Sequence, residues 1–193
     1  MAKGRLAHVE PGDTAEHLDE AVDALGRMEE LVDDLLDLAR DGRDIDTTES
    51  VDVADTARSA WNSVEAPASA LRVDVAESVT ADGGRLTQLF GNLFRNSIEH
   101  GGDPENGHSP AEVTVTVGAM DDGFYVADDG PGIPESERED VFETGYSTNE
   151  DGTGFGLDIV REIVDAHGWT VAVTESKSGG ARFEITGVAA DDG

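Results

Sequence analysis

Residues 126–134 read VADDGPGIP and place two carboxylates, Asp128 and Asp129, directly before a Gly-Pro-Gly turn. Because Asp, Gly and Pro are common turn residues, one interpretation is simply a turn that ends a strand. The other is a ligand site, because glycines allow the backbone to approach a bound molecule closely. The rest of the sequence has to decide between the two.

Two further clusters stand on either side of this stretch. In NLFRNSIEHG (92–101), Asn92 and Asn96 are four residues apart and share one helix face, with His100 a turn further along. In DGTGFGL (151–157), three glycines lead into a helical pattern, where free amides and the helix dipole suit a phosphate chain. Each cluster alone is a weak indication, since a polar helix face and a structural cap explain them equally well.

The hydrophobic pattern around these clusters alternates between helical and strand periods. Helices are predicted over 53–65, 83–101 and 156–168, and β-strands over 71–76, 112–120, 123–129, 169–176 and 181–187. The mixture predicts an α+β fold, a two-layer α/β sandwich in which helices cover one face of a single sheet.

A separate amphipathic pattern precedes this domain. Apolar residues recur every three or four positions from 14 to 40, and the opposite face is acidic. One such helix needs a partner, so we expect a truncated or dimer-completed helical hairpin, with a helix lying on the main domain as the alternative. Residues 41–50 have no hydrophobic period and are interpreted as a linker. The expected organisation is a partial hairpin over 1–42, a main domain over 51–188 and an acidic tail over 189–193.

The composition limits the partners. Thirteen Lys and Arg against 43 Asp and Glu give a net charge of −30, which repels nucleic acids and anionic membrane surfaces. The acidic residues are spread through every segment, which is typical of a surface adapted to high salt, as in a halophilic archaeon; an acidic interaction surface is the alternative. The chain has no cysteine, and neither a signal peptide nor a long apolar run is evident. We therefore expect a soluble, cytoplasmic chain, although a longer parent protein could be attached to a membrane.

Taken in order, the clusters resemble a known family. NLFRNSIEHG, DDGPGIP, VFETGYS and DGTGFGL, followed by DIVREIVDAHG and GGARFEI, are similar to the N, G1, F and G2 boxes of the ATP-binding domain of two-component sensor histidine kinases. That domain belongs to the GHKL superfamily, and the resemblance covers about 51–187. Residues 16–42 also resemble the second helix of the dimerization and histidine-phosphotransfer hairpin.

The resemblance implies Mg-ATP binding and assigns roles to individual residues. Asp128 corresponds to the carboxylate that accepts a hydrogen bond from the adenine amino group, and Asn96 to the residue that coordinates Mg²⁺. Asn92 stands where hydrolytic members of the superfamily carry a Glu base, and an amide cannot take a proton from water, which favours a kinase. The remaining implied nucleotide-binding residues are Arg95, His100, Gly130, Gly132, Ile133, Thr148, Gly152, Thr153, Gly154, Phe155, Gly156 and Leu157.

Two departures from the family pattern qualify this assignment. Glu99 occupies a position that is commonly Lys or Arg; Arg95 can supply the charge instead, or can simply pair with Glu99. None of the five histidines is followed by Glu, so the phosphoacceptor motif His-Glu-x-x-x-Pro is missing; His167 is expected to cap a helix.

The function implied is transfer of the γ-phosphoryl group of ATP to a histidine on a phosphotransfer helix. The partners implied are that helix, a response regulator, and a second copy of the chain joined through the N-terminal helix. The alternatives are a GHKL kinase that phosphorylates Ser of a partner protein, as anti-sigma-factor kinases do, and a module that senses ATP without turnover.

Overall fold

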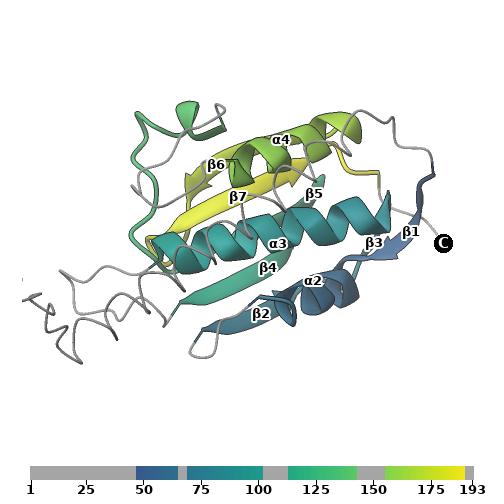
Figure 1. Cartoon of the computed structure of the whole chain (residues 1–193), viewed down its shortest axis with the longest axis horizontal. Helices are drawn as coiled ribbons and strands as arrows, with labels where there is room; N and C mark the ends of the chain where they lie inside the picture. Colours follow the sequence, from purple (N-terminus) through teal and green to yellow (C-terminus); the bar gives the residue numbers. More distant parts are fainter. Residues whose placement is uncertain (1–46, 65–68, 102–112, 143–154, 190–193) are drawn as a thin grey trace, which may run out of the picture.

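The computed structural model describes residues 47–64, 69–101, 113–142 and 155–189 (Figure 1). The predicted N-terminal helix, most of the predicted linker and residues 190–193 of the tail lie outside these ranges. The helices are α2 (Val53–Trp61), α3 (Gly83–His100), α4 (Gly156–Ala166) and the short 3-10 helix η2 (Asp140–Phe142). The strands are β1 (Glu49–Asp52), β2 (Ala70–Asp74), β3 (Ser78–Ala81), β4 (Thr114–Met120), β5 (Gly123–Ala127), β6 (Thr170–Glu175) and β7 (Ala181–Thr186).

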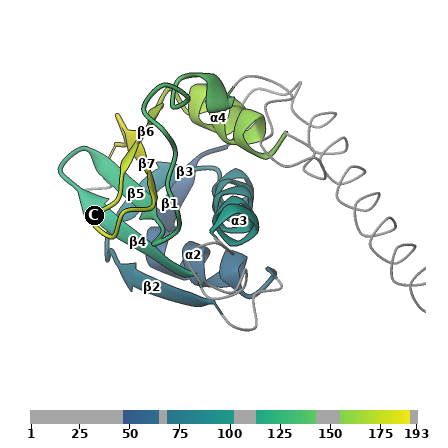
Figure 2. The ribbon, with the colours of Figure 1, turned by 90° about the vertical axis from the view of Figure 1, so that its left-hand side faces the viewer.

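Five strands form the main sheet in the order β2-β4-β5-β7-β6. The β2–β4 pair is parallel, and the other three pairs are antiparallel. Helices α2, α3 and α4 cover one face of this sheet, with α3 in the middle (Figure 2). The predicted α+β two-layer sandwich is therefore confirmed.

The core lies between the sheet and the helices because each element carries apolar residues on the facing side. Phe90 and Phe94 of α3 are fully buried, and the Phe90 ring centroid lies 5.5 Å from that of Phe124 on β5. Trp61 of α2 packs edge-on against Phe94 at 5.3 Å. Burial of these rings fixes α3 against the centre of the sheet.

Two aspartates determine where the first two helices begin. The Asp52 side chain accepts a hydrogen bond from the Asp55 amide at 2.8 Å, and the Asp82 side chain accepts one from the Arg85 amide at 3.0 Å. Each bond satisfies an amide that has no partner within the helix.

The end of α4 confirms the prediction made for His167. His167 is the C-cap residue, and its Nδ1 donates to the Ile163 carbonyl oxygen at 2.7 Å. Its Nε2 accepts the Asp82 amide at 3.1 Å, and its ring stacks on Trp169 with centroids 4.2 Å apart. The imidazole therefore joins the end of α4 to the start of α3.

A second sheet was not predicted. Strands β1 and β3 pair antiparallel over four residues each, from Glu49 opposite Ala81 to Asp52 opposite Ser78. Each strand is too short to display a period of two, and β1 begins inside the stretch interpreted as linker. In the described part of the chain, no helix combines the length and the apolar character needed to cross a membrane.

Candidate functional site

Asp128 follows β5 directly and is buried, with 7% of its surface exposed. Its Oδ1 accepts hydrogen bonds from two backbone amides, Gly130 at 3.0 Å and Ala181 at 3.0 Å. Its Oδ2 accepts one from the Ser97 hydroxyl at 3.2 Å. Because a carboxylate has about four acceptor positions, these bonds fill Oδ1 and leave capacity on Oδ2.

Burial also changes the acidity of this group. Removal from water raises the pKa of the Asp128 carboxyl above its ordinary value of 3.8, while the bonds from Gly130, Ala181 and Ser97 oppose that rise. The neighbouring carboxylate of Asp129 raises the pKa of Asp128 slightly further. A buried, perturbed carboxylate held by three separate elements is typical of a binding site.

Asp129 has a different function from its neighbour. Its Oδ1 accepts a hydrogen bond at 2.7 Å from the amide of Thr114, the first residue of β4. The interpretation as a turn next to a strand therefore describes Asp129, which binds the first residue of β4. Asp128 is directed into a buried polar cluster, and its interpretation as part of a ligand site stays a prediction.

The glycines after Asp128 permit close backbone contact. A side chain at Gly130 would place its Cβ 2.8 Å from the Cα of Gly101, so the loop lies directly on the end of α3. Gly132 has a φ of +76°, a conformation that other residues rarely adopt. Ile133 is partly buried against the core, and its carbonyl oxygen accepts the Arg138 Nε at 3.0 Å.

Helix α3 brings the other predicted residues towards Asp128. Asn92 is 7% exposed, and its Nδ2 donates to the Gln88 carbonyl oxygen at 3.1 Å. Asn96 is half-buried one turn further along. His100, also half-buried, is close enough to Asp128 for the two to interact electrostatically: burial lowers the pKa of His100, and the Asp128 charge partly opposes this. His100 thus connects α3 to Asp128, and Asn96 and Asn92 lie one and two turns before it on the helix.

Arg95 and Glu99 lie one turn apart on the same helix. Arg95 is half-buried, and Glu99 is exposed. The two roles predicted for Arg95, binding a phosphate group or pairing with Glu99, both stay predictions.

The start of α4 reaches the same region. Phe155 is the N-cap residue, with no side-chain cap, and both Phe155 and Leu157 pack against the core. A Cβ at Gly156 would lie 3.6 Å from the Asn92 Oδ1, so the first turn of α4 and the middle of α3 are adjacent. The other predicted lid residues, Thr148, Gly152, Thr153 and Gly154, lie outside the described residues.

The sequence analysis did not predict three residues that form hydrogen bonds with Asp128. Ser97, only 2% exposed, binds the Asp128 carboxylate. The turn between β6 and β7 supplies Ser176, and the first residue of β7 supplies the Ala181 amide. Ser97 directly follows Asn96, and Ala181 lies within the quoted GGARFEI. Only the pairing of β5 with β7 shows that this turn meets Asp128.

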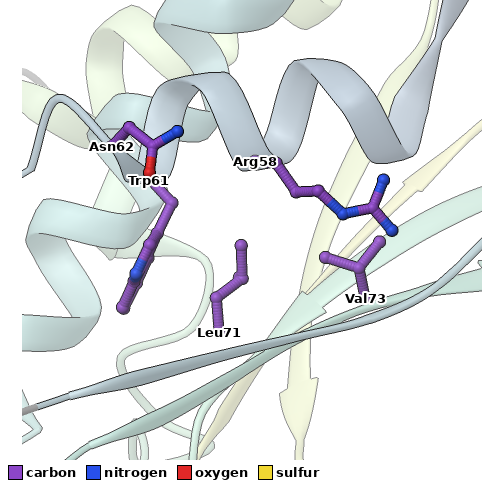
Figure 3. Close-up of a pocket in the computed structure, with 5 residues that line it drawn as sticks. All are labelled: Arg58, Trp61, Asn62, Leu71 and Val73. Carbon is purple, nitrogen blue, oxygen red and sulfur yellow. The ribbon is translucent and has the colours of Figure 1, made fainter.

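A separate open cavity of about 450 Å³ lies between α2 and the edge strand β2 (Figure 3). Arg58, Trp61, Asn62, Leu71 and Val73 line it. None of these residues belongs to the Asp128 cluster, which consists of Asp128 and the residues bonded to it, Ser97, Gly130, Ser176 and Ala181. The cavity and the candidate site are therefore distinct.

Comparison with known proteins identifies the family to which this chain belongs. Residues 81–188 match the sequence profile of the family described as histidine kinase-, DNA gyrase B- and HSP90-like ATPase. The chain belongs to this family. The match includes α3, the Asp128 cluster and the β6–β7 turn.

The curated relatives of this histidine kinase-like ATPase domain are sensor kinases. The sensor histidine kinase ZraS of Escherichia coli O157:H7 is 35% identical over 112 residues, which cover 58% of this chain and 24% of ZraS. The histidine-protein kinase/phosphatase MprB of Mycobacterium avium (strain 104) is 32% identical over 192 residues, covering 91% of this chain and 36% of MprB. The chain thus spans only about a quarter to a third of the length of these relatives.

Solved structures agree on the fold of the domain. Full-length ShkA, solved in complex with AMPPNP, superposes with a TM-score of 0.66 and 30% identity, covering 96% of this chain and 40% of ShkA. A mycobacterial sensor histidine kinase MprB structure gives a TM-score of 0.60 and 25% identity, covering 75% of this chain and 97% of that one. A histidine kinase-like ATPase domain of the kind found in two-component signalling is therefore present.

Proposed function

We propose that this domain binds Mg-ATP at the Asp128 end of α3 and transfers its γ-phosphoryl group to a histidine on a phosphotransfer helix. The observation that carries the proposal is the buried Asp128 carboxylate, whose Oδ1 is filled by two backbone amides and whose Oδ2 keeps acceptor capacity. A group placed in this way selects a ligand that donates a hydrogen bond.

Adenine meets this requirement and guanine does not. The exocyclic amino group of adenine is a donor, whereas guanine carries a keto oxygen at the same ring position, which would face the carboxylate. A site built to bind a donor rejects an analogue without one strongly, because a buried acceptor would be left unpaired. The glycines that follow Asp128, Gly130 and Gly132, pack closely on the backbone of Gly101 and Gly179, so they hold the loop beside the carboxylate in place.

Residues on α3 and α4 suit the phosphate end of the nucleotide. The half-buried Asn96 offers a neutral oxygen of the kind that binds Mg²⁺, and the ion would supply charge neutralisation for the phosphate oxygens. The glycine-rich segment from Gly152 to Leu157 would contribute backbone amides at the start of α4. Asn92 lies beside Gly156, the first residue of α4. Because its side-chain amide cannot take a proton from water, it favours transfer of the phosphoryl group to another group over hydrolysis.

The acceptor histidine has to be supplied by another segment or chain, because none of the five histidines is followed by Glu. We propose that residues 1–42 are a partial dimerization hairpin, and that residues 16–42 form its second helix and pair with a helix that carries the acceptor. A homodimer, a response regulator downstream and a cytoplasmic location follow from the same assignment.

One alternative is favoured by a specific observation. Glu99 is exposed at a position where the family commonly has a basic residue, and the chain carries no acceptor motif. Both facts agree with a module that binds ATP without turning it over.

A phosphotransfer assay separates these functions. The chain is incubated with radiolabelled Mg-ATP alone, with a sensor-kinase hairpin that carries the acceptor histidine, and with the same hairpin in which that histidine is replaced by Gln. The proposal expects acid-labile, base-stable label on the intact hairpin only. Label on this chain alone, or ATP binding without label on any hairpin, contradicts the kinase assignment, and the second result supports the sensing module.

A further inference from the structure

The turn between β6 and β7 is organised by one buried hydroxyl. Ser176, 7% exposed, donates through Oγ to the Asp128 carbonyl oxygen at 2.7 Å. The same Oγ accepts the Ser178 amide at 3.1 Å and the Gly180 amide at 3.2 Å. Its one donor and both acceptor positions are therefore used, and all three bonds go to the backbone.

The backbone of this turn packs so closely against Asp128 and the loop after it that a larger residue than glycine would not fit. A Cβ at Gly180 would overlap Asp128, and a Cβ at Gly132 would lie 2.8 Å from the Gly179 carbonyl oxygen. The turn, Asp128 and the loop after it are thus stacked backbone on backbone. The hydrogen bonds of Ser176 cross these backbone contacts and hold the layers together.

The carboxylate depends on the position of this turn. The Ala181 amide, which directly follows Gly180, donates to Asp128 Oδ1, and the Asp128 amide donates back to the Ala181 carbonyl oxygen at 2.9 Å. A shift of the turn therefore removes one of the two amides that fix Oδ1. The Gly130 amide and the Ser97 hydroxyl then remain as partners of the carboxylate, so the direction of Oδ2 is fixed less firmly.

We propose that Ser176 is a positioning residue for nucleotide binding, which acts through Asp128 without touching the ligand. This inference rests on the proposed ATP site. The Ser176 hydroxyl lies on the backbone side of Asp128, and its bonding capacity is already filled. Its contribution is to fix the direction of the Oδ2 acceptor, so its loss is expected to affect recognition of the base and not of the phosphates.

The test compares three variants of the whole chain, titrated with Mg-ATP and with Mg-tripolyphosphate, which has no base. Ser176→Ala removes the hydroxyl that forms the three backbone hydrogen bonds, and Ser176→Thr keeps a hydroxyl at this position. Ser178→Ala, the control, removes an exposed hydroxyl two residues further along the same turn. We expect Ser176→Ala to weaken ATP binding about tenfold, the difference of about 1.4 kcal/mol that one misplaced hydrogen bond represents. Tripolyphosphate affinity, and ATP affinity in the other two variants, should stay within about twofold of the unmodified chain.

Each outcome separates the inference from the function on which it rests. If the unmodified chain fails to bind ATP, the proposed function and the inference both fall. If it binds ATP and Ser176→Ala binds equally well, or loses ATP and tripolyphosphate equally, the positioning role is wrong and the ATP site stands. Should Ser176→Ala not fold, as judged by circular dichroism, Ser176→Cys replaces it: the thiol has a similar shape but is a weak donor, and an unchanged ATP affinity would overturn the inference.

Discussion

The two ends of α3 differ in what their polar groups bind. At the start of the helix, Asp82 caps the Arg85 amide and donates its own amide to His167, so the chain supplies the partners itself. At the other end, Asp128 receives three hydrogen bonds but keeps acceptor capacity on Oδ2. At the start of α3, which we call the closed end, the polar groups bind one another. At the other end, the Asp128 Oδ2 can still accept a hydrogen bond from a ligand. Stability and binding should therefore be separable by mutation.

The largest expected effect is on binding, from Asp128→Asn. Because two amides hold Oδ1, the Asn oxygen should occupy that position and the NH₂ group should take the place of Oδ2. A donor then faces the adenine amino group, which we expect to weaken ATP binding by about 2 kcal/mol or more, roughly 30-fold. The NH₂ group also suits the keto oxygen of guanine, so the preference for ATP over GTP should shrink or reverse. Calorimetric titration with both nucleotides measures this.

Asp129→Asn is the matched control, because it is the adjacent residue and its Oδ1 can still accept the Thr114 amide. It should bind ATP as the unmodified chain does. An Asp128→Asn variant with unchanged affinity would remove Asp128 from the site.

The next effect concerns the closed end. His167→Ala removes the acceptor of the Asp82 amide, the donor to Ile163 and a ring stacked on Trp169. We expect a loss of about 1–3 kcal/mol in the free energy of unfolding, measured by denaturant titration. The dissociation constant for ATP, measured where the variant is folded, should not change. A large loss of affinity with little loss of stability would show that the two ends are not separable.

Changing the pH should affect binding and stability in opposite directions. As pH falls, protonation of Asp128 turns its acceptor into a donor, so ATP affinity should decline from a higher pH than the ordinary value of 3.8 implies. Since the folded pKa is raised, the contribution of this group to stability is present below the ordinary value and is lost as pH rises through the folded pKa. The free energy of unfolding of the unmodified chain, relative to Asp128→Asn, should therefore fall as pH rises above the ordinary pKa of 3.8 and through the raised folded pKa. A difference independent of pH would contradict the buried state of this carboxyl.

Salt should act on the surface and leave the site almost unchanged. With a net charge of −30, repulsion is screened as the Debye length falls from about 8 Å at 0.15 M to about 3 Å at 1 M. The melting temperature should rise with KCl concentration, while the ATP-over-GTP preference should change by less than about twofold, because Asp128 is buried. A melting temperature that does not rise with salt would make the high-salt interpretation wrong.

Much of the fold could be predicted because its signals are local. The apolar period of residues 83–101 predicted α3 to within a residue of its end, and the later strands showed clear alternation. Strands β1 and β3 gave no such signal, since four residues with one or two buried positions carry too little pattern.

The candidate site was predictable where a motif carries it and not where topology does. Asp128 and the Asn92–Asn96 spacing are visible in the sequence, and Ser97, next to Asn96 on α3, contacts Asp128. Ser176 lies 48 residues from Asp128, and its hydroxyl meets a backbone oxygen. No residue pattern encodes such a contact, because it arises only when β7 pairs with β5.

The most direct test of the central claim is a titration of the isotope-labelled chain with Mg-ATP, followed through its backbone amide resonances. The account predicts that the largest shifts occur at the amides of Gly130 and Ala181, which bind Asp128, while the Asp82 amide at the closed end of α3 barely moves. Shifts concentrated at Trp61 and Val73 in the cavity beside β2, or no shifts at all, would contradict it.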